Sequence, residues 1–177
     1  MMSILKMVLL GVPKIRKALR FLRGAKKAGK ENKKLKLFIK RFIGQRVLGG
    51  QCVGLYRQYI KDVLKLPALE GLGSTGGASG LFTRYDTDVG PLSRRYLERI
   101  AFDGNNRPEP GDVVIYGPTE TNRWGHVGIY VEPSNAPGEM IIFDQHGFGS
   151  QEDAGAQLRP RSNIGLLGWL RKRQRRL

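Results

Sequence analysis

The sequence predicts a single domain of the α+β class, with helices first along the chain and antiparallel strands after them. Two observations support this prediction. Apolar residues follow a helical period before residue 66, and three short segments after residue 110 alternate as strands do. The length of 177 residues suits one ordinary domain with appendages, and no internal repeat is present.

The first expected helix runs from Pro13 to Arg23 and carries apolar residues at positions i, i+4 and i+7 among many basic ones. A polar basic stretch from 24 to 34 follows. A second helical pattern then begins, in which Leu35, Phe38, Ile39 and Phe42 share one face. Residues 1–44 are thus expected to form a basic amphipathic segment. Two interpretations stay open: it packs on the domain, or it binds a membrane or an anionic polymer.

A third helix is expected to begin at Cys52. Gly44, Gly49 and Gly50 interrupt the chain just before it, and the following apolar residues keep a helical period until Leu66 and Pro67. Residues 71–80 are rich in glycine and serine and are expected to form a loop.

Three strands are expected after the turn at residues 108–112. They are Val113 to Tyr116, His126 to Val131, and Met140 to Asp144, and the segments between them are rich in turn-forming residues. Together with the helices they predict N-terminal helices packed on a small antiparallel sheet.

The positive charge of the chain lies at its two ends. Residues 1–46 carry 15 Lys and Arg and one acid, residues 47–170 carry 11 basic and 14 acidic residues, and residues 171–177 add five basic ones. These counts agree with a division of the chain into a basic segment (1–44), a mildly acidic globular domain (45–170) and a basic tail (171–177). Such ends favour polyanionic partners, namely an anionic wall polymer, a membrane surface or nucleic acid.

The N-terminus resembles neither a signal peptide nor a membrane span. Its apolar run covers only residues 8–12 and leads into Pro13 and a basic stretch without a small-residue cleavage site. A span needs about 20 apolar residues. We therefore expect neither a signal peptide nor a transmembrane span.

Cys52 is the only cysteine, which excludes an internal disulfide and a cysteine-rich zinc site. A lone cysteine is most often a small buried apolar residue. Its place at the start of a helix argues for chemistry instead, because the positive end of the helix dipole favours a thiolate. Gln51, just before it, has a side-chain amide that can donate a hydrogen bond to an oxyanion.

His126 is the candidate base for this thiol. Alternation along its strand places Val127, Ile129 and Val131 toward the core, and His126 on the opposite face, outside the apolar layer. Gly128 is expected to clear space there for a ligand.

Asp144 and His146 end the third strand on one face. If this strand pairs with that of His126, then Asp144 can accept a hydrogen bond from the imidazole and orient it. Taken singly, His126 and Asp144 would more often be structural or solvated residues. The order Cys, His, Asp over helix, strand, strand makes the combined signal stronger than any member.

Four motifs in this order resemble the CHAP domain, the cysteine, histidine-dependent amidohydrolase/peptidase domain of the papain-like and NlpC/P60 superfamily. The motifs are Gln51-Cys52-Val53 at a helix start, Pro110-Gly111-Asp112-Val113-Val114, Gly125-His126-Val127-Gly128-Ile129-Tyr130-Val131, and Phe143-Asp144-Gln145. The closing residues 166–171 are similar to the end of many phage lysin domains of this type. The resemblance covers roughly residues 45–171.

The resemblance implies a papain-like fold in which Cys52 is the nucleophile, His126 the general base, Asp144 the orienting acid and Gln51 an oxyanion donor. Trp124 and His146 are further candidates for contacting the substrate. Many members have Glu in place of Asp144 and Asn in place of His146. Residues 35–51 lack the acids of a calcium loop. We therefore expect no metal site and no cofactor.

The function implied is hydrolysis of bacterial peptidoglycan, either as an endopeptidase or as an N-acetylmuramoyl-L-alanine amidase. The expected setting is a phage endolysin released from the host cytoplasm, or a lysin carried by the virion tail among other virion proteins. The alternative is a structural virion protein that keeps the fold and uses its basic ends to bind DNA, membrane or neighbouring subunits.

Overall fold

A computed structural model describes residues 30–66, 76–87, 92–145 and 155–173. The helices are α3 (Lys30–Phe42), α4 (Cys52–Asp62) and the short α5 (Gly80–Thr83), with 3₁₀ turns at Leu48–Gly50 and Leu92–Arg95. The strands are β1 (Leu97–Ala101), β2 (Val113–Tyr116), β3 (His126–Pro133), β4 (Glu139–Asp144), β5 (Gln157–Ser162) and β6 (Leu166–Lys172). The amphipathic helix expected at 13–23 lies outside the described residues.

All strands join one antiparallel sheet in the order β1-β6-β2-β3-β4-β5, so the chain belongs to the α+β class. The three expected strands form its centre as β2, β3 and β4. The sheet has twice as many strands as expected. β1, β5 and β6 were not predicted from the sequence, because these strands carry no clear apolar alternation. β5 even contains Pro160, which is tolerated because β5 is an edge strand.

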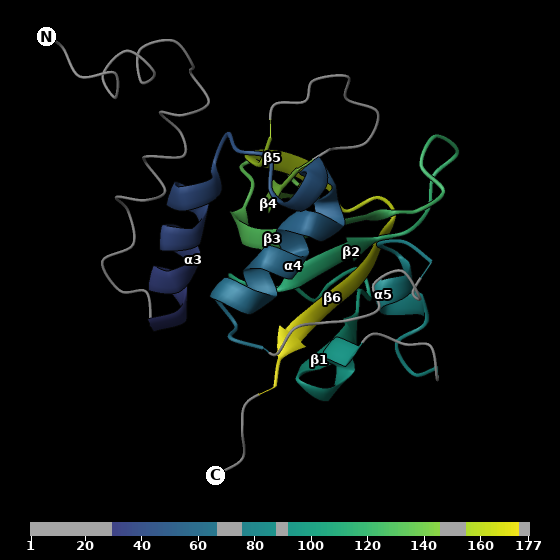
Figure 1. Cartoon of the computed structure of the whole chain (residues 1–177). Helices are drawn as coiled ribbons and strands as arrows, with labels where there is room; N and C mark the ends of the chain where they lie inside the picture. The colour runs from purple at the N-terminus through teal and green to yellow at the C-terminus, as the bar shows by residue number, and fades with distance from the viewer. Residues whose placement is uncertain (1–29, 67–75, 88–91, 146–154, 174–177) are drawn as a thin grey trace, which may run out of the picture.

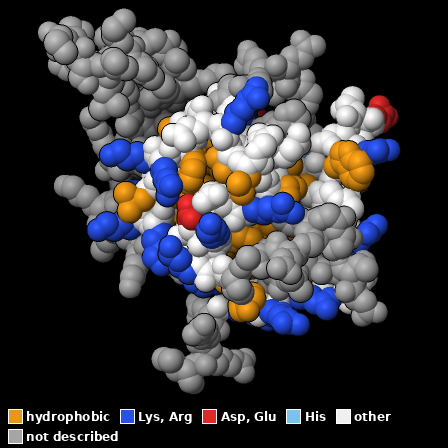
Figure 2. All heavy atoms as spheres, viewed as in Figure 1, with side chains coloured by type: hydrophobic (Ala, Val, Ile, Leu, Met, Phe, Trp, Pro, Cys, Tyr) orange, Lys and Arg blue, Asp and Glu red, His pale blue; other side chains and the backbone are white. Residues whose placement is uncertain are grey.

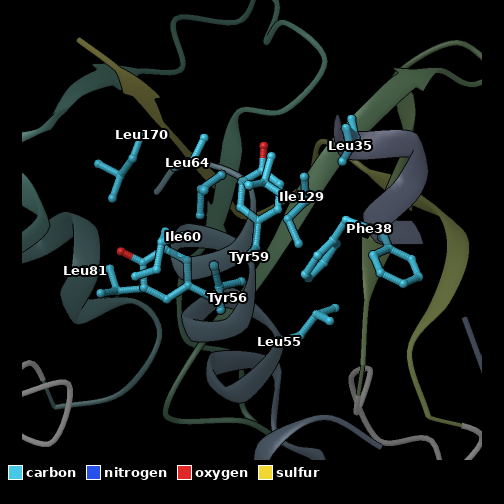
Figure 3. Packing of buried hydrophobic residues seen from close by; sticks show 14 of the residues in the cluster. Leu35, Phe38, Leu55, Tyr56, Tyr59, Ile60, Leu64, Leu81, Ile129 and Leu170 are labelled. Carbon is cyan, nitrogen blue, oxygen red and sulfur yellow. The ribbon is translucent and has the colours of Figure 1, made fainter. Parts of the chain in front are cut away.

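Helix α4 lies across one face of the sheet, with α3 beside it (Figure 1). α3 begins at Lys30, inside the stretch expected to separate two helices, and it turns Leu35, Phe38 and Ile39 into the core. The Phe38 ring lies 5.4 Å from that of Tyr59 on α4 and 6.1 Å from that of Phe143 on β4. Figure 3 shows Phe38 and Tyr59 meeting above the sheet near Ile129. Helix α3 therefore packs in the same core as the sheet.

The other face of the sheet is also buried, which corrects the expectation that His126 would lie outside the apolar layer. Alternation along β3 holds, since Val127, Ile129 and Val131 join the core under the helices. The opposite face forms a second core of strand residues: Val114, Tyr116, Tyr130, Met140, Ile142, Leu166 and Trp169. The pairing of β2 with β6 and of β3 with β4 each contains a register shift, the irregularity that a bulge produces.

Among the described residues, none of the helices combines the length and the apolar character needed to cross a membrane.

Candidate functional site

Cys52 is the first residue of α4, and its side chain is partly exposed. Gln51 before it is extended (φ −81°, ψ 150°), so the helix starts abruptly at the thiol. At such a start the first amide N–H groups have no partners within the helix and can bind an anionic atom. The side chain of Gln51 is exposed and makes no capping hydrogen bond to the helix.

His126 and Asp144 meet on the face of the sheet opposite to the one that carries Val127, Ile129 and Val131. Strands β3 and β4 pair as expected, with Ile129 opposite Phe143, which places Asp144 opposite Gly128 and diagonal to His126. The imidazole Nε2 and Asp144 Oδ2 are 2.8 Å apart, and both side chains are 0% exposed. A buried carboxylate at this distance fixes the ring and its tautomer, with the proton on Nε2.

Cys52 interacts with the same imidazole. Asp144 holds Nε2, so Nδ1 is the ring nitrogen available to take the thiol proton. Burial lowers the pKa of His126, but the interactions with Asp144 and Cys52 outweigh it and raise the pKa to about 9. The protonated ring is therefore stabilised beside the sulfur, a condition that favours transfer of the thiol proton to the imidazole.

The space beside Gly128 is filled, contrary to expectation, by β4 and not left for a ligand. A Cβ atom at this position would lie 2.8 Å from Ile142 Cδ1 and 3.3 Å from Asp144 Cβ. The lack of a side chain at Gly128 thus leaves room for the Asp144 side chain to reach His126. Gly125, just before the histidine, has a φ of +70° that brings the chain against Tyr116 and Ser79.

Two arginines on β5 also bind Asp144. Arg159 Nη1 donates to Oδ1 at 2.6 Å, and Arg161 donates to Oδ2 from Nε at 3.1 Å and from Nη2 at 2.9 Å. Burial raises the pKa of Asp144, but His126 and the two guanidinium groups outweigh it and hold the pKa at about 2. The carboxylate is therefore charged across the physiological pH range.

Gln145 holds the loop before Cys52, a role the sequence did not suggest. Its side chain is 0% exposed and donates from Nε2 to the carbonyl oxygens of Val47 and Gln51, each at 2.6 Å. Its Oε1 accepts from Val47 N–H at 3.0 Å. Because Gln145 follows Asp144, one short segment anchors both the imidazole and the loop that carries the thiol.

The remaining site candidates are Trp124 and His146, and no contact described above joins either of them to Cys52, His126 or Asp144. Trp124 is 51% exposed, and the guanidinium of Arg123 lies 4.5 Å from the centre of its ring. His146 lies outside the described residues. A cavity of about 860 Å³ opens at the C-terminal end of α4, lined by Tyr59 and Arg171 among others, but Cys52, His126 and Asp144 do not line it.

No protein-family model matches the sequence, and no curated protein matches it either. Solved structures do match the fold. The wild-type endolysin LysIME-EF1 aligns with a TM-score of 0.52 and 19% identity, over 81% of this chain and 64% of that one. Ly7917 aligns with a TM-score of 0.59 and 14% identity, over 80% of this chain and 62% of that one.

The chain shares its fold with an endolysin. A second structure of Ly7917, solved with the hydrolyzing product of MDP, aligns with a TM-score of 0.56. Sequence identities of 14–19% make this a likeness of fold alone, and the chain spans less than two thirds of the length of either protein.

Chemically, the arrangement combines a nucleophilic atom, a base and an orienting acid. The sulfur is accessible, the imidazole is held between thiol and carboxylate, and the helix start offers amide donors beside the sulfur. These are the parts that acyl transfer through a thioester needs. Among the residues that the structure describes, no group of His, Cys, Asp or Glu forms a metal site.

Proposed function

We propose that the chain is a peptidoglycan hydrolase of the CHAP type, which cleaves amide bonds with Cys52 as nucleophile. The observation that carries this proposal is the grouping of Cys52, His126 and Asp144, in which the carboxylate holds the imidazole at 2.8 Å and Cys52 interacts with the same ring, on a fold shared with an endolysin. Residues 45–170 are the catalytic domain in this proposal.

The first half of the reaction forms a thioester. His126 Nδ1 takes the thiol proton, and the sulfur attacks the amide carbonyl. Its oxygen becomes an oxyanion, held by amide N–H groups at the start of α4 and by the side chain of Gln51. The imidazolium then donates its proton to the leaving nitrogen as the C–N bond breaks.

The second half releases the acyl group. His126 takes a proton from water, the resulting hydroxide attacks the thioester, and the sulfur leaves as thiolate and recovers its proton from the imidazolium. Asp144 stays ionised throughout and orients the ring. No step requires a cofactor.

The substrate amide lies either within the stem or cross-bridge peptides or between muramic acid and alanine. Trp124 is our candidate for contacting the substrate, because it is exposed and stands two residues before His126 in the chain. The protein would act as a free endolysin that reaches the wall after release from the host cell, or as part of a phage virion.

Mass spectrometry of purified peptidoglycan after digestion tests the function directly. We expect new termini: a free alanine amine with intact glycan for an amidase, or new peptide ends for an endopeptidase. A parallel digest with Cys52→Ser is the blank. If the wild-type digest contains no termini beyond those of the blank, this proposed function is wrong.

Polyanion binding is a second candidate function, favoured by the exposed basic side chains of α3 and α4. Lys33, Lys40, Arg57 and Lys61 are all exposed. Figure 2 shows Lys and Arg side chains spread over the face on which these helices lie. The same surface can attach a hydrolase to an anionic wall polymer or serve a structural protein that binds nucleic acid.

Neutralising this surface should weaken binding and its salt dependence. In the quadruple variant Lys33→Gln, Lys40→Gln, Arg57→Gln and Lys61→Gln, we expect the slope of log K against log salt for duplex DNA to fall by about 3 to 4, because each lost phosphate contact removes about 0.9. Fluorescence anisotropy at several salt concentrations measures it.

Cys52→Ala is the matched control for this binding, because it removes the thiol without changing the charge. We expect it to bind as the wild type does. An unchanged slope in the quadruple variant would place any polyanion binding elsewhere, for example in residues 1–29, and a deletion of those residues checks that alternative.

A further inference from the structure

The orienting acid of the site is shared between three cationic or proton-donating groups. Asp144 Oδ2 accepts hydrogen bonds from His126 Nε2, Arg161 Nε and Arg161 Nη2, at 2.8, 3.1 and 2.9 Å. Oδ1 accepts a hydrogen bond from Arg159 Nη1 at 2.6 Å. Imidazole and Arg161 therefore compete for the same oxygen, whereas Arg159 holds the other one.

These arginines are built into the site and are not loose surface groups. Their side chains are 19% and 17% exposed, and the carboxylate between them is 0% exposed. Strand β5 pairs with β4 so that Asp144 stands opposite Gln157. Because side chains alternate along a strand, positions 159 and 161 of β5 lie on the same face of the sheet as Asp144. Charge-assisted hydrogen bonds from a guanidinium to a buried carboxylate are among the stronger side-chain contacts.

We propose that Arg161 is a positioning residue that acts through Asp144: by occupying Oδ2 it limits the share of the carboxylate charge that the imidazole of His126 receives. The idea rests on the proposed hydrolase function. His126 has to take a proton from the thiol and then return one to the leaving nitrogen. An unshared buried carboxylate would hold the imidazolium too firmly for the second step.

Burial lowers the basicity of His126, and among the charged groups around it Arg161 is the one placed to limit that basicity further. Cys52 from α4 and Asp144 from β4 both favour the protonated ring. Tyr116 from β2 lies with its ring centre 6.4 Å from that of His126, and burial raises its pKa, so it stays neutral. The positive charges on this side come from Arg159 and Arg161 on β5, and only Arg161 shares an oxygen with the imidazole.

The test is an NMR titration of His126 in the full-length protein, which does not depend on any activity. The chain has only two histidines, so His146→Ala assigns the signals. In Arg161→Met we expect the midpoint of His126 to rise by about one pH unit, the lower end of the effect of a neighbouring charge. Arg159 keeps Asp144 in place in this variant.

Arg161→Gln is the second variant in case Arg161→Met does not fold, and a shift in the same direction is expected. Arg99→Met is the matched control, because Arg99 also pairs with an aspartate, Asp86, but on the surface. Its titration should equal that of the wild type. In the hydrolysis assay, the alkaline limb of the pH profile of kcat/KM should shift to higher pH in Arg161→Met, together with the NMR midpoint.

An unchanged or lowered midpoint in folded Arg161 variants would overturn the proposal, since a merely structural arginine would let Asp144 drift away and reduce the basicity of the imidazole. The two proposals fail separately. A raised midpoint in a protein that frees no peptidoglycan termini would sink the hydrolase function but leave the effect of Arg161 on His126 standing.

Discussion

Cys52→Ala is expected to reduce the release of new peptidoglycan termini by about 10⁴-fold or more, because loss of a nucleophile removes the whole covalent route. Cys52 is partly exposed and stands in a helix, where alanine is well tolerated, so the fold should survive. We expect the free energy of unfolding to change by less than about 1 kcal/mol, as for most partly exposed sites. Termini counted by mass spectrometry, together with urea denaturation, measure both quantities.

Ile164→Ala is the control for this experiment, since Ile164 is 89% exposed and stands in the turn between β5 and β6. It should behave as the wild type in both assays. Hydrolysis that persists undiminished in Cys52→Ala would exclude a thiol mechanism and leave the binding function as the better candidate.

Asp144→Ala is expected to cause the largest loss of stability, about 3 kcal/mol or more, because removing one member of a buried ion group leaves its partners unpaired. His126, Arg159 and Arg161 all lose their shared acceptor. Activity should fall by about 10²-fold or more, since the imidazole loses its orientation. Asp144→Asn keeps one acceptor oxygen and should lose less stability.

The pH dependence of this loss follows from the low pKa of Asp144. The folded pKa is about 2 against an ordinary value of 3.8, so the carboxylate contributes stability fully above about pH 4 and loses it as the pH falls toward 2. The stability difference between wild type and Asp144→Ala should therefore shrink below pH 4. It should also shrink as the pH rises from about 6.5 toward 9, because the imidazole of His126 loses the proton that Asp144 stabilises. Urea denaturation at several pH values measures it.

Asp86→Ala is the matched control, because the Asp86 carboxylate also pairs with an arginine but is 67% exposed. Such a surface pair contributes less than about 1 kcal/mol. Equal losses in Asp86→Ala and Asp144→Ala would contradict the view that burial makes the Asp144 group important.

The central elements of the site were predictable because each is encoded locally. Glycines ahead of Cys52 and apolar periodicity after it predict a helix that starts at the thiol, and α4 begins at that residue. Alternation predicts the strands that became β2, β3 and β4, and their pairing brings His126 to Asp144. The interpretation of these residues as catalytic remains a proposal.

The partners of Asp144 were not predictable, for a physical reason. Arg159-Pro160-Arg161 has the composition of a loop, and only its pairing with β4 turns both arginines toward the carboxylate. Gln145 is similar, since its buried contacts reach Val47, which lies about a hundred residues earlier in the chain.

The sequence by itself thus determined the α+β class, the order of thiol, imidazole and carboxylate, and the basic character of the chain ends. Local periodicity and charge are properties of neighbouring residues, so they can be recognised in the chain alone. Only the tertiary structure decided that His126 is buried, that Gly128 makes room for Asp144, and that two arginines share its charge. These features depend on strand pairing and on packing between segments far apart in the chain, on both faces of the sheet, and no local pattern encodes those contacts.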